Sequence, residues 1–351
     1  MPHLPKASLT RRATIGYGTA LATVAATGMA RAAGVVTVYS ADGLKDGKPN
    51  WFDTVFTAFT KKTGIAVNYI EGGSGVVVNR VLAERANPQA DILVTLPPFM
   101  QQAAAKGVLA PMRPAALTAI PAATRSAHDL WFPLVNNYAC WIYNTKRLTA
   151  PPAHYADLLS AKFKNRLQYS TPGQAGDGTA VMLEAIHVMG GADQGFGYLH
   201  KLQTNNLGPS SSTGRLAGLV DKSEILVANG DVQMNFAQMR QYPNIGIFFP
   251  AGANGRRISM PLPYDVALVK NAPHGGNGAK LIDFMLSREA QDSVYDIARG
   301  FPVRSDVPAT GKTATALKEI MQGVDIWVPH WAKVLASLDA NIARWHQVTA
   351  S

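Results

Sequence analysis

Residues 169–181 have the sequence Tyr-Ser-Thr-Pro-Gly-Gln-Ala-Gly-Asp-Gly-Thr-Ala-Val, which joins two apolar runs through a glycine-rich turn. The run that begins at Thr179 has the composition of a helix. A turn of this kind exposes backbone N–H groups at a helix N-terminus, where the helix dipole favours anions. The stretch predicts an anion-binding turn, with a capped helix after a plain loop as the alternative. Asp177 would either cap that helix or face a cationic group of a ligand.

A second stretch repeats the design. Residues 67–70 are typical of a strand, residues 71–75 are Glu-Gly-Gly-Ser-Gly, and residues 76–86 have helical composition. Two such turns predict two similar halves, each offering a helix end to one small anionic ligand.

Composition excludes several classes of protein. The chain has 351 residues, of which 47% are hydrophobic and 16% are charged, so it can bury a large core and is long enough for two domains. Its net charge is +10, of which the four basic residues before Gly34 supply +4. The remaining +6 is a mild basic excess that suits an anionic ligand, and no basic run with interleaved aromatic residues indicates nucleic acid. A single cysteine, Cys140, excludes an intrachain disulfide and a multi-cysteine metal site.

The N-terminus has the pattern of a secretory signal peptide over residues 1–33. Arg11 and Arg12 precede a moderately apolar stretch, and Ala30-Arg31-Ala32 offers small residues for cleavage. The adjacent arginines resemble a twin-arginine signal. We therefore expect the mature protein to begin near Ala33 or Gly34 and to lie in the periplasm.

The first part of the mature chain alternates strands and helices. Strands are predicted over 35–39, 65–70 and 90–95, and helices over 51–62, 76–86 and 99–105. This order predicts a parallel sheet whose ligand-facing loops follow the strand C-termini. Those loops would hold Ser40, Ser74 and Thr95.

The second part is less regular. Residues 137–143 and 263–269 are predicted strands, and Asn229-Gly230 is predicted to form a tight turn between two apolar segments. Asn235 would follow the second segment, where it could reach a cleft. Further helices are expected over 179–189, 195–203, 278–287, 289–297, 314–321 and 331–344.

No catalytic motif is complete. Gly311-Lys312-Thr313 lacks the first glycine of a P-loop, and residues 72–76 lack the last glycine of a nucleophile elbow. The eight histidines do not pair at helical zinc spacing. We expect no enzyme activity, no metal site and no cofactor, with a periplasmic hydrolase as a distant alternative.

Several long runs resemble one family. They are Val-Thr-Val-Tyr-Ser-Ala-Asp-Gly-Leu at 36–44, Glu-Gly-Gly-Ser-Gly-Val-Val-Val at 71–78, Leu-Gln-Tyr-Ser-Thr-Pro-Gly-Gln-Ala at 167–175, Asp-Gly-Thr-Ala-Val-Met-Leu at 177–183 and Pro-Val-Arg-Ser-Asp-Val at 302–307. With them, the chain resembles the 2-aminoethylphosphonate-binding subfamily of the periplasmic substrate-binding proteins of ABC importers, from about Val35 to Thr349.

The resemblance implies a type II periplasmic-binding-protein fold, with two α/β lobes that each contain a mainly parallel sheet. Lobe 1 would comprise residues 34–135 and 266–351, and lobe 2 residues 136–265. A monomer would capture 2-aminoethylphosphonate between the lobes by hinge closure and deliver it to the transmembrane subunits of an ABC permease. The same fold could instead bind phosphate, thiamine, a polyamine or iron, although iron would require paired adjacent tyrosines that the chain lacks.

The candidate ligand-binding residues divide by charge. A phosphonate requires N–H and hydroxyl donors, and an ammonium group requires a carboxylate or an aromatic face. Candidates for the phosphonate are Ser40, Ser74, Gly75, Thr95, Ser170, Thr171, Gly178 and Thr179. Candidates for the ammonium group are Tyr39, Asp42, Glu71, Tyr138, Asp177 and Tyr264. For each of the acids and tyrosines a structural role, as a cap, a turn residue or part of the core, is the alternative.

Overall fold

The computed structural model describes residues 34–350, so the predicted signal peptide lies outside the described residues. The first sheet contains β1 (Gly34–Ala41), β2 (Ile65–Gly72), β3 (Ile92–Thr95), β4 (Leu109–Ala110) and β11 (Tyr264–Val269), in the order β2-β1-β3-β11-β4. Strand β5 (Phe132–Val135) pairs with β11. Strands β1, β2 and β3 are parallel, as predicted, and β11 runs antiparallel to β3.

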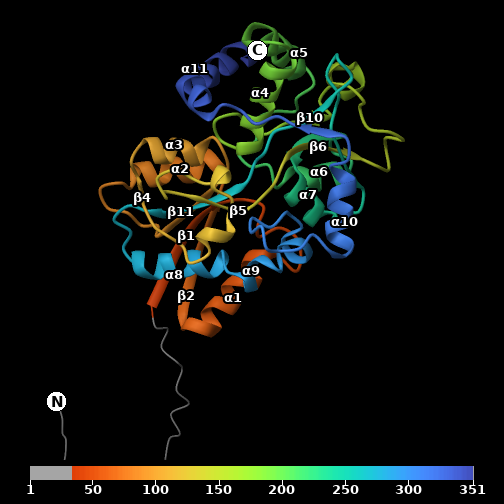
Figure 1. Cartoon of the computed structure of the whole chain (residues 1–351). Coiled ribbons are helices and arrows are strands. Elements are labelled where there is room, and N and C mark those ends of the chain that lie inside the picture. Colours follow the sequence, from red (N-terminus) through yellow and green to blue (C-terminus); the bar gives the residue numbers. More distant parts are fainter. Residues whose placement is uncertain (1–33, 351) are drawn as a thin grey trace, which may run out of the picture. The chain divides into compact units, whose positions relative to one another are not determined.

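Helices cover both faces of the first sheet (Figure 1). Helices α1 (Trp51–Thr63) and α8 (Gly275–Met285) pack on the face that carries Val36 and Val38. Helices α2 (Ser74–Ala83) and α3 (Phe99–Ala105) pack on the opposite face with Tyr39. Side chains alternate along a strand, so consecutive residues of β1 and β11 point to different sides of this sheet.

The second sheet has the order β7-β8-β6-β9, formed by β6 (Ala139–Asn144), β7 (Leu167–Gln168), β8 (Val227–Asp231) and β9 (Ile245–Phe248). Strand β6 is antiparallel to both β8 and β9, and only β7 and β8 are parallel. Strands β7, β8 and β9 therefore run in the same direction, as expected for a mainly parallel sheet, and only β6, which lies between β8 and β9, is reversed. Strand β6 enters this sheet from β5 of the first sheet, so no helical crossover within the second sheet fixes its direction relative to β8 and β9.

The prediction of a tight turn at Asn229-Gly230 was wrong. Both residues lie inside β8, where they pair with Trp141 and Cys140 of β6. The strand ends at Asp231, whose carboxylate accepts a hydrogen bond from the Met234 N–H and caps α7 (Val232–Gln238). Burial of the strand on both sides, rather than the local turn preference, determined this conformation.

Helices α4 (Gly176–Val188) and α6 (Leu216–Asp221) contact β8 of the second sheet, and α5 (Ala192–Gln203) packs against α4. The remaining helices are α9 (Arg288–Gln291), α10 (Gly311–Ile320) and α11 (Trp331–Thr349), and β10 (Arg257–Ser259) pairs with β12 (Val324–Ile326). None of the helices described between residues 34 and 350 has the length and hydropathy that a membrane span requires.

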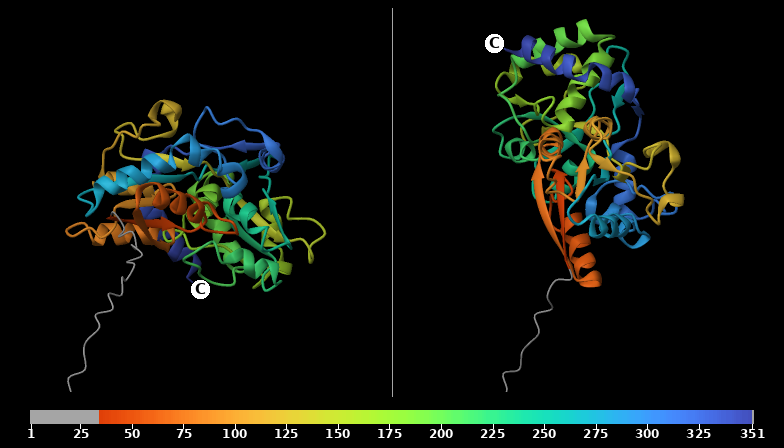
Figure 2. Two further views of the ribbon diagram at one scale, coloured as in Figure 1. Left: turned by 90° about the horizontal axis from the view of Figure 1, so that it is seen from below. Right: turned by 90° about the vertical axis from the view of Figure 1, so that its left-hand side faces the viewer.

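The C-terminal helix α11 lies beside α5, and the right-hand view of Figure 2 shows it (dark blue) next to the green helices. Trp345 Nε1 donates to Tyr169 Oη at 3.2 Å, and Arg344 pairs with Asp193 at 2.7 Å. These contacts attach α11 to α5 and to the residue that follows β7, both within predicted lobe 2, whereas the predicted boundary assigns α11 to lobe 1.

Candidate functional site

The two glycine-rich turns lie against each other. The Gly75 N–H, in the first turn of α2, donates to the Gln174 carbonyl at 2.9 Å. A Cβ atom on Gly75 would collide with the Gly173 carbonyl oxygen, and one on Gly73 would collide with the Ser211 carbonyl oxygen. The contact is therefore possible only because both positions are glycine.

The residues predicted to supply hydroxyl groups form hydrogen bonds in and next to these turns. Thr95 Oγ1 donates to the Ser74 carbonyl at 3.1 Å, and Thr179 Oγ1 donates to the Ala175 carbonyl at 2.9 Å. Ser170 N donates to Asn229 Oδ1 at 2.8 Å, and Thr171 Oγ1 accepts from the Ser210 N–H at 3.1 Å.

Gly178 lies so close to the Ser170 carbonyl that no Cβ atom fits there. Ser40 Oγ donates to the Ala41 carbonyl at 2.7 Å. All of these side chains are buried at the end of the sheets where the two turns meet.

Four aspartates from three parts of the chain form what we call the acidic cluster: Asp42 and Asp46 in the loop after β1, Asp177 in the first turn of α4 and Asp231 at the end of β8. Asp42 Oδ2 accepts from the Gly214 N–H at 2.9 Å and from Ser212 Oγ. Tyr264 Oη lies 3.0 Å from the Asp42 carbonyl oxygen and 3.3 Å from Asp231 Oδ2, so it joins two of the three segments.

The electrostatics of the acidic cluster favour a bound cation. Burial, followed by repulsion from Asp231 and Asp42, raises the pKa of Asp177 well above its ordinary value. Burial is also the main cause that raises the pKa of Asp231 to about 7, with Asp42 adding to it. Burial and the charges of Asp42 and Glu71 raise the pKa of Asp46.

Like charges held together away from water disfavour the ionised state unless a cation compensates them. None of the ion pairs among residues 34–350 includes a member of the acidic cluster. In addition, Asp177 Oδ1 and Gln233 Oε1 are buried acceptors without a hydrogen-bond partner. The site can therefore accept hydrogen bonds from a positively charged group.

Other predicted residues lie apart from the acidic cluster. The Tyr39 ring faces α2, where the Arg80 guanidinium lies 4.4 Å from its centroid and Glu84 accepts its hydroxyl at 3.0 Å. Tyr138 packs edge-on against Phe301, with 5.5 Å between ring centroids. Their part in ligand binding remains a prediction.

Two further candidates are held by local hydrogen bonds. Glu71 is exposed and accepts from Tyr69 Oη at 2.8 Å, although its charge still acts on Asp46. Asn235 is buried and donates to Gln238 Oε1 at 2.9 Å. Gln238 in turn donates to Asp46 Oδ2 at 3.0 Å, so Asn235 reaches the acidic cluster only through Gln238.

Sequence reasoning missed Asp46 and Asp231. Asp231 gave a usable signal, because an aspartate directly before an apolar helical segment is a typical N-cap. The N-cap signal of Asp231 was overlooked because a tight turn was predicted at the two preceding residues, Asn229 and Gly230. Nothing in the local sequence distinguishes Asp46 from a surface turn residue.

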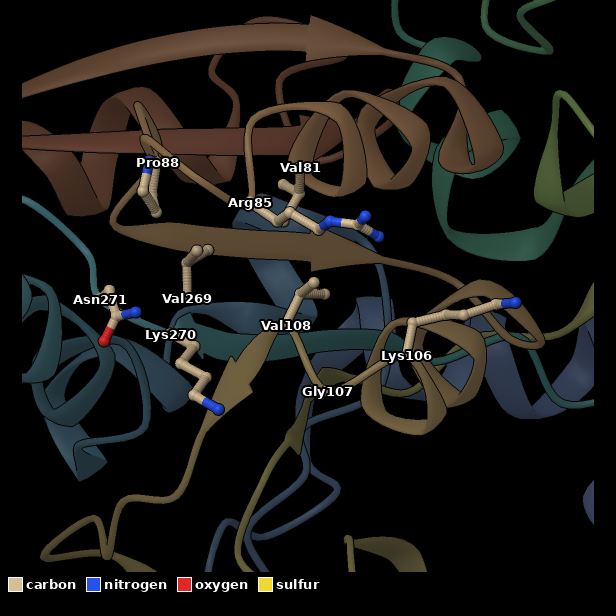
Figure 3. A pocket seen from close by; sticks show the side chains of 9 residues that line it. All are labelled: Val81, Arg85, Pro88, Lys106, Gly107, Val108, Val269, Lys270 and Asn271. Carbon is tan, nitrogen blue, oxygen red and sulfur yellow. The ribbon is translucent and has the colours of Figure 1, made fainter.

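A separate hollow of about 200 Å³ lies near the C-terminal ends of α2 and β11, away from the predicted site residues (Figure 3). Arg85, Lys106 and Lys270 are among the residues that line it. Figure 3 shows that their charged ends spread apart rather than converge, so they do not form one anion-binding cluster. Among residues 34–350, no group of three or more His, Cys, Asp or Glu side chains is arranged to hold a metal ion.

Comparison with known proteins identifies the family of this chain. The chain is 56% identical over 317 residues to a Salmonella paratyphi A protein named "Putative 2-aminoethylphosphonate-binding periplasmic protein", covering 90% of this chain and 93% of that one. A protein of the same name from Salmonella typhimurium is 55% identical over the same shares.

Solved structures show the same fold at lower identity. The periplasmic binding protein P5PA superposes with a TM-score of 0.78 at 20% identity, covering 90% of this chain and 99% of that one. A periplasmic thiamin binding protein superposes with a TM-score of 0.75 at 18% identity, covering 90% and 96%. These matches support the two-lobed type II periplasmic-binding-protein fold.

Residues 45–292 match the family described as bacterial extracellular solute-binding proteins. The chain therefore belongs to the bacterial extracellular solute-binding proteins, which bind a small molecule and deliver it to an ABC importer.

Proposed function

We propose that this protein binds 2-aminoethylphosphonate between its two lobes and delivers it to an ABC permease from the periplasm. The observation that carries the proposal is the position of the acidic cluster beside the N-terminus of α4. A carboxylate-rich site next to a helix N-terminus suits a small ligand with an ammonium group at one end and a phosphonate at the other. The names of the relatives from Salmonella support the same ligand.

The ammonium group would bind the acidic cluster. Asp177 offers a buried oxygen without a partner, and Asp42 and Asp231 lie close enough to raise its pKa. An ammonium group has three N–H donors, so it can bond several of these oxygens at once. Its charge would also offset the repulsion among them.

The phosphonate would lie at the helix N-termini. The first-turn N–H groups of α4 have no intrahelical acceptor and carry the positive end of the helix dipole. Ser74, Thr95 and Ser170 add buried hydroxyl groups near this end. Phosphonate oxygens and backbone N–H groups form charge-assisted hydrogen bonds of the stronger kind.

We propose that the lobes close over the ligand by a hinge near 136–139 and 263–266, where the chain passes between the two sheets. The proposed boundaries keep 34–135 in lobe 1 and 136–265 in lobe 2. The contacts of α11 favour moving 331–349 to lobe 2. Three contacts would hold the closed form, from Asp42 to Gly214, from Gly75 to Gln174 and from Gln238 to Asp46. We expect the protein to act as a monomer and not as an enzyme.

Titration calorimetry tests the ligand directly. Purified protein is titrated with 2-aminoethylphosphonate, ethylphosphonate and inorganic phosphate. One-site binding to 2-aminoethylphosphonate, with much weaker binding of the other two, would support separate ammonium and anion subsites. Equal binding of all three would show an anion-binding protein with structural carboxylates. No heat with any of them would refute the phosphonate assignment, and phosphate release from 2-aminoethylphosphonate would favour the hydrolase alternative.

A further inference from the structure

A second cavity, of about 460 Å³, lies beside the segments that cross between the two sheets. Its walls come from α3, the loop before β5, both crossing segments and the segment between β12 and α11. This volume is within the usual range for small-molecule sites. None of the four aspartates of the acidic cluster lines it.

Asp265 is the buried acid of this cavity. The residue is fully buried, and neither of its carboxylate oxygens has a hydrogen-bond partner. Side chains alternate along β11, so Tyr264 points toward the acidic cluster and Asp265 points to the opposite face, where it lines the cavity. An unpartnered buried carboxylate is costly, and this one has no compensating group among the described residues.

A second acceptor and three aromatic rings complete the cavity. Gln101 Oε1 is also buried without a partner, so two acceptors line the same space. Trp131, Tyr138 and Trp331 supply ring surfaces. A carboxylate with aromatic walls is the combination that recognises organic ammonium ions.

Arg125 is the other charged residue that lines the cavity. Its Nη1 atom lies 3.4 Å from Asp129 Oδ1, while its Nε–H group is buried without a hydrogen-bond partner. Arg125 makes no hydrogen bond to Asp265, whose two carboxylate oxygens both remain without a partner. Burial alone raises the pKa of Asp265, without a contribution from another carboxylate, which separates this site electrostatically from the acidic cluster.

We propose that this cavity is a second binding site, for a small organic ammonium ion whose N–H groups bond Asp265 and Gln101 and whose apolar part packs on the aromatic rings. The site is distinct from the one proposed above for 2-aminoethylphosphonate and does not depend on that proposal.

The test uses 2-phenylethylammonium chloride as the probe and 2-phenylethanol as its neutral analogue. Trp131 and Trp331 line the cavity, so intrinsic fluorescence reports binding, and calorimetry measures affinity. Asp265→Asn keeps the shape and removes the charge, and it should weaken the ammonium probe by about tenfold or more, the range for a hydrogen bond to a charged group. The neutral analogue should bind both proteins equally.

Two other variants complete the design. Gln101→Leu, on α3 rather than in the sheet, should weaken the probe several-fold even if Asp265→Asn folds poorly. Asp177→Asn alters the acidic cluster and should leave probe binding unchanged. The proposal is overturned if the probe does not bind, if Asp265→Asn and Gln101→Leu bind it as well as the unaltered protein, or if Asp177→Asn alone abolishes binding.

Discussion

Replacing Asp177 by Asn tests the proposed ammonium subsite most directly. The substitution keeps the size and shape of the side chain and removes one negative charge. Asp177 is buried, and its Oδ1 atom has no partner among the described residues, so that oxygen is free to accept a bond from the ligand. We expect the variant to bind 2-aminoethylphosphonate more weakly and ethylphosphonate at least as well as the unaltered protein.

The size of the loss follows from the surroundings of Asp177. A hydrogen bond to a charged group contributes about 1.5–3 kcal/mol, which corresponds to a ten- to hundredfold change in Kd. A larger loss is not expected, because Asp42 and Asp231 remain to balance the ammonium charge. Ethylphosphonate lacks the amine and would lose only an unfavourable repulsion between its anion and the carboxylate.

Titration calorimetry with both ligands provides the ratio of the two affinities, which should fall by about tenfold or more. Glu224→Gln is the matched control, since it removes the charge of an exposed carboxylate that forms none of the ion pairs described between residues 34 and 350. An equal loss for both ligands would refute the reasoning by showing that Asp177 supports the turn. Unchanged binding of both would show that its carboxylate does not face the amine.

Three further predictions follow from the same contacts. Burial raises the pKa of Asp231 to about 7 in the folded protein, so the stability that this group contributes is complete below about pH 4 and is lost as the pH rises through 7. The melting temperature of the ligand-free protein should therefore fall between pH 5 and pH 8. The variant Asp231→Asn retains the helix cap and should reduce that fall. Asp265→Leu should increase the free energy of unfolding by about 1–3 kcal/mol, because it replaces an unpartnered buried carboxylate; burial raises the pKa of Asp265, so the gain measured by urea denaturation should be greater at pH 8 than at pH 5, and an equal gain at both would show that the group does not titrate there. Gly75→Ala should weaken 2-aminoethylphosphonate binding and leave the ligand-bound protein less compact in small-angle scattering, because the added Cβ would strike the Gly173 carbonyl oxygen. Gly197→Ala is the control, because a Cβ atom there meets nothing within 4 Å. Identical behaviour of the two variants would contradict the proposed closure of the lobes.

Local sequence patterns predicted most of the elements around the site. The alternation of strands and helices from residue 34 to 105 was confirmed, and both glycine-rich turns precede helices, α2 and α4. These features depend on side-chain spacing and turn residues within a few positions, which a sequence displays directly. The same patterns failed at Asn229-Gly230, where burial of β8 between β6 and β7 outweighed the preference of that dipeptide for a turn.

The sequence by itself determined the family, the elements and the two turns, because repeated local signals specify them. Only the tertiary structure decided which acids meet. Asp42, Asp177 and Asp231 lie on segments far apart in the chain, and their convergence depends on how the two sheets pack against each other. It also decided that Tyr264 points to the acidic cluster and Asp265 to the second cavity. Adjacent residues of a strand point to opposite faces, and what lies on each face is set by the packing of the whole chain.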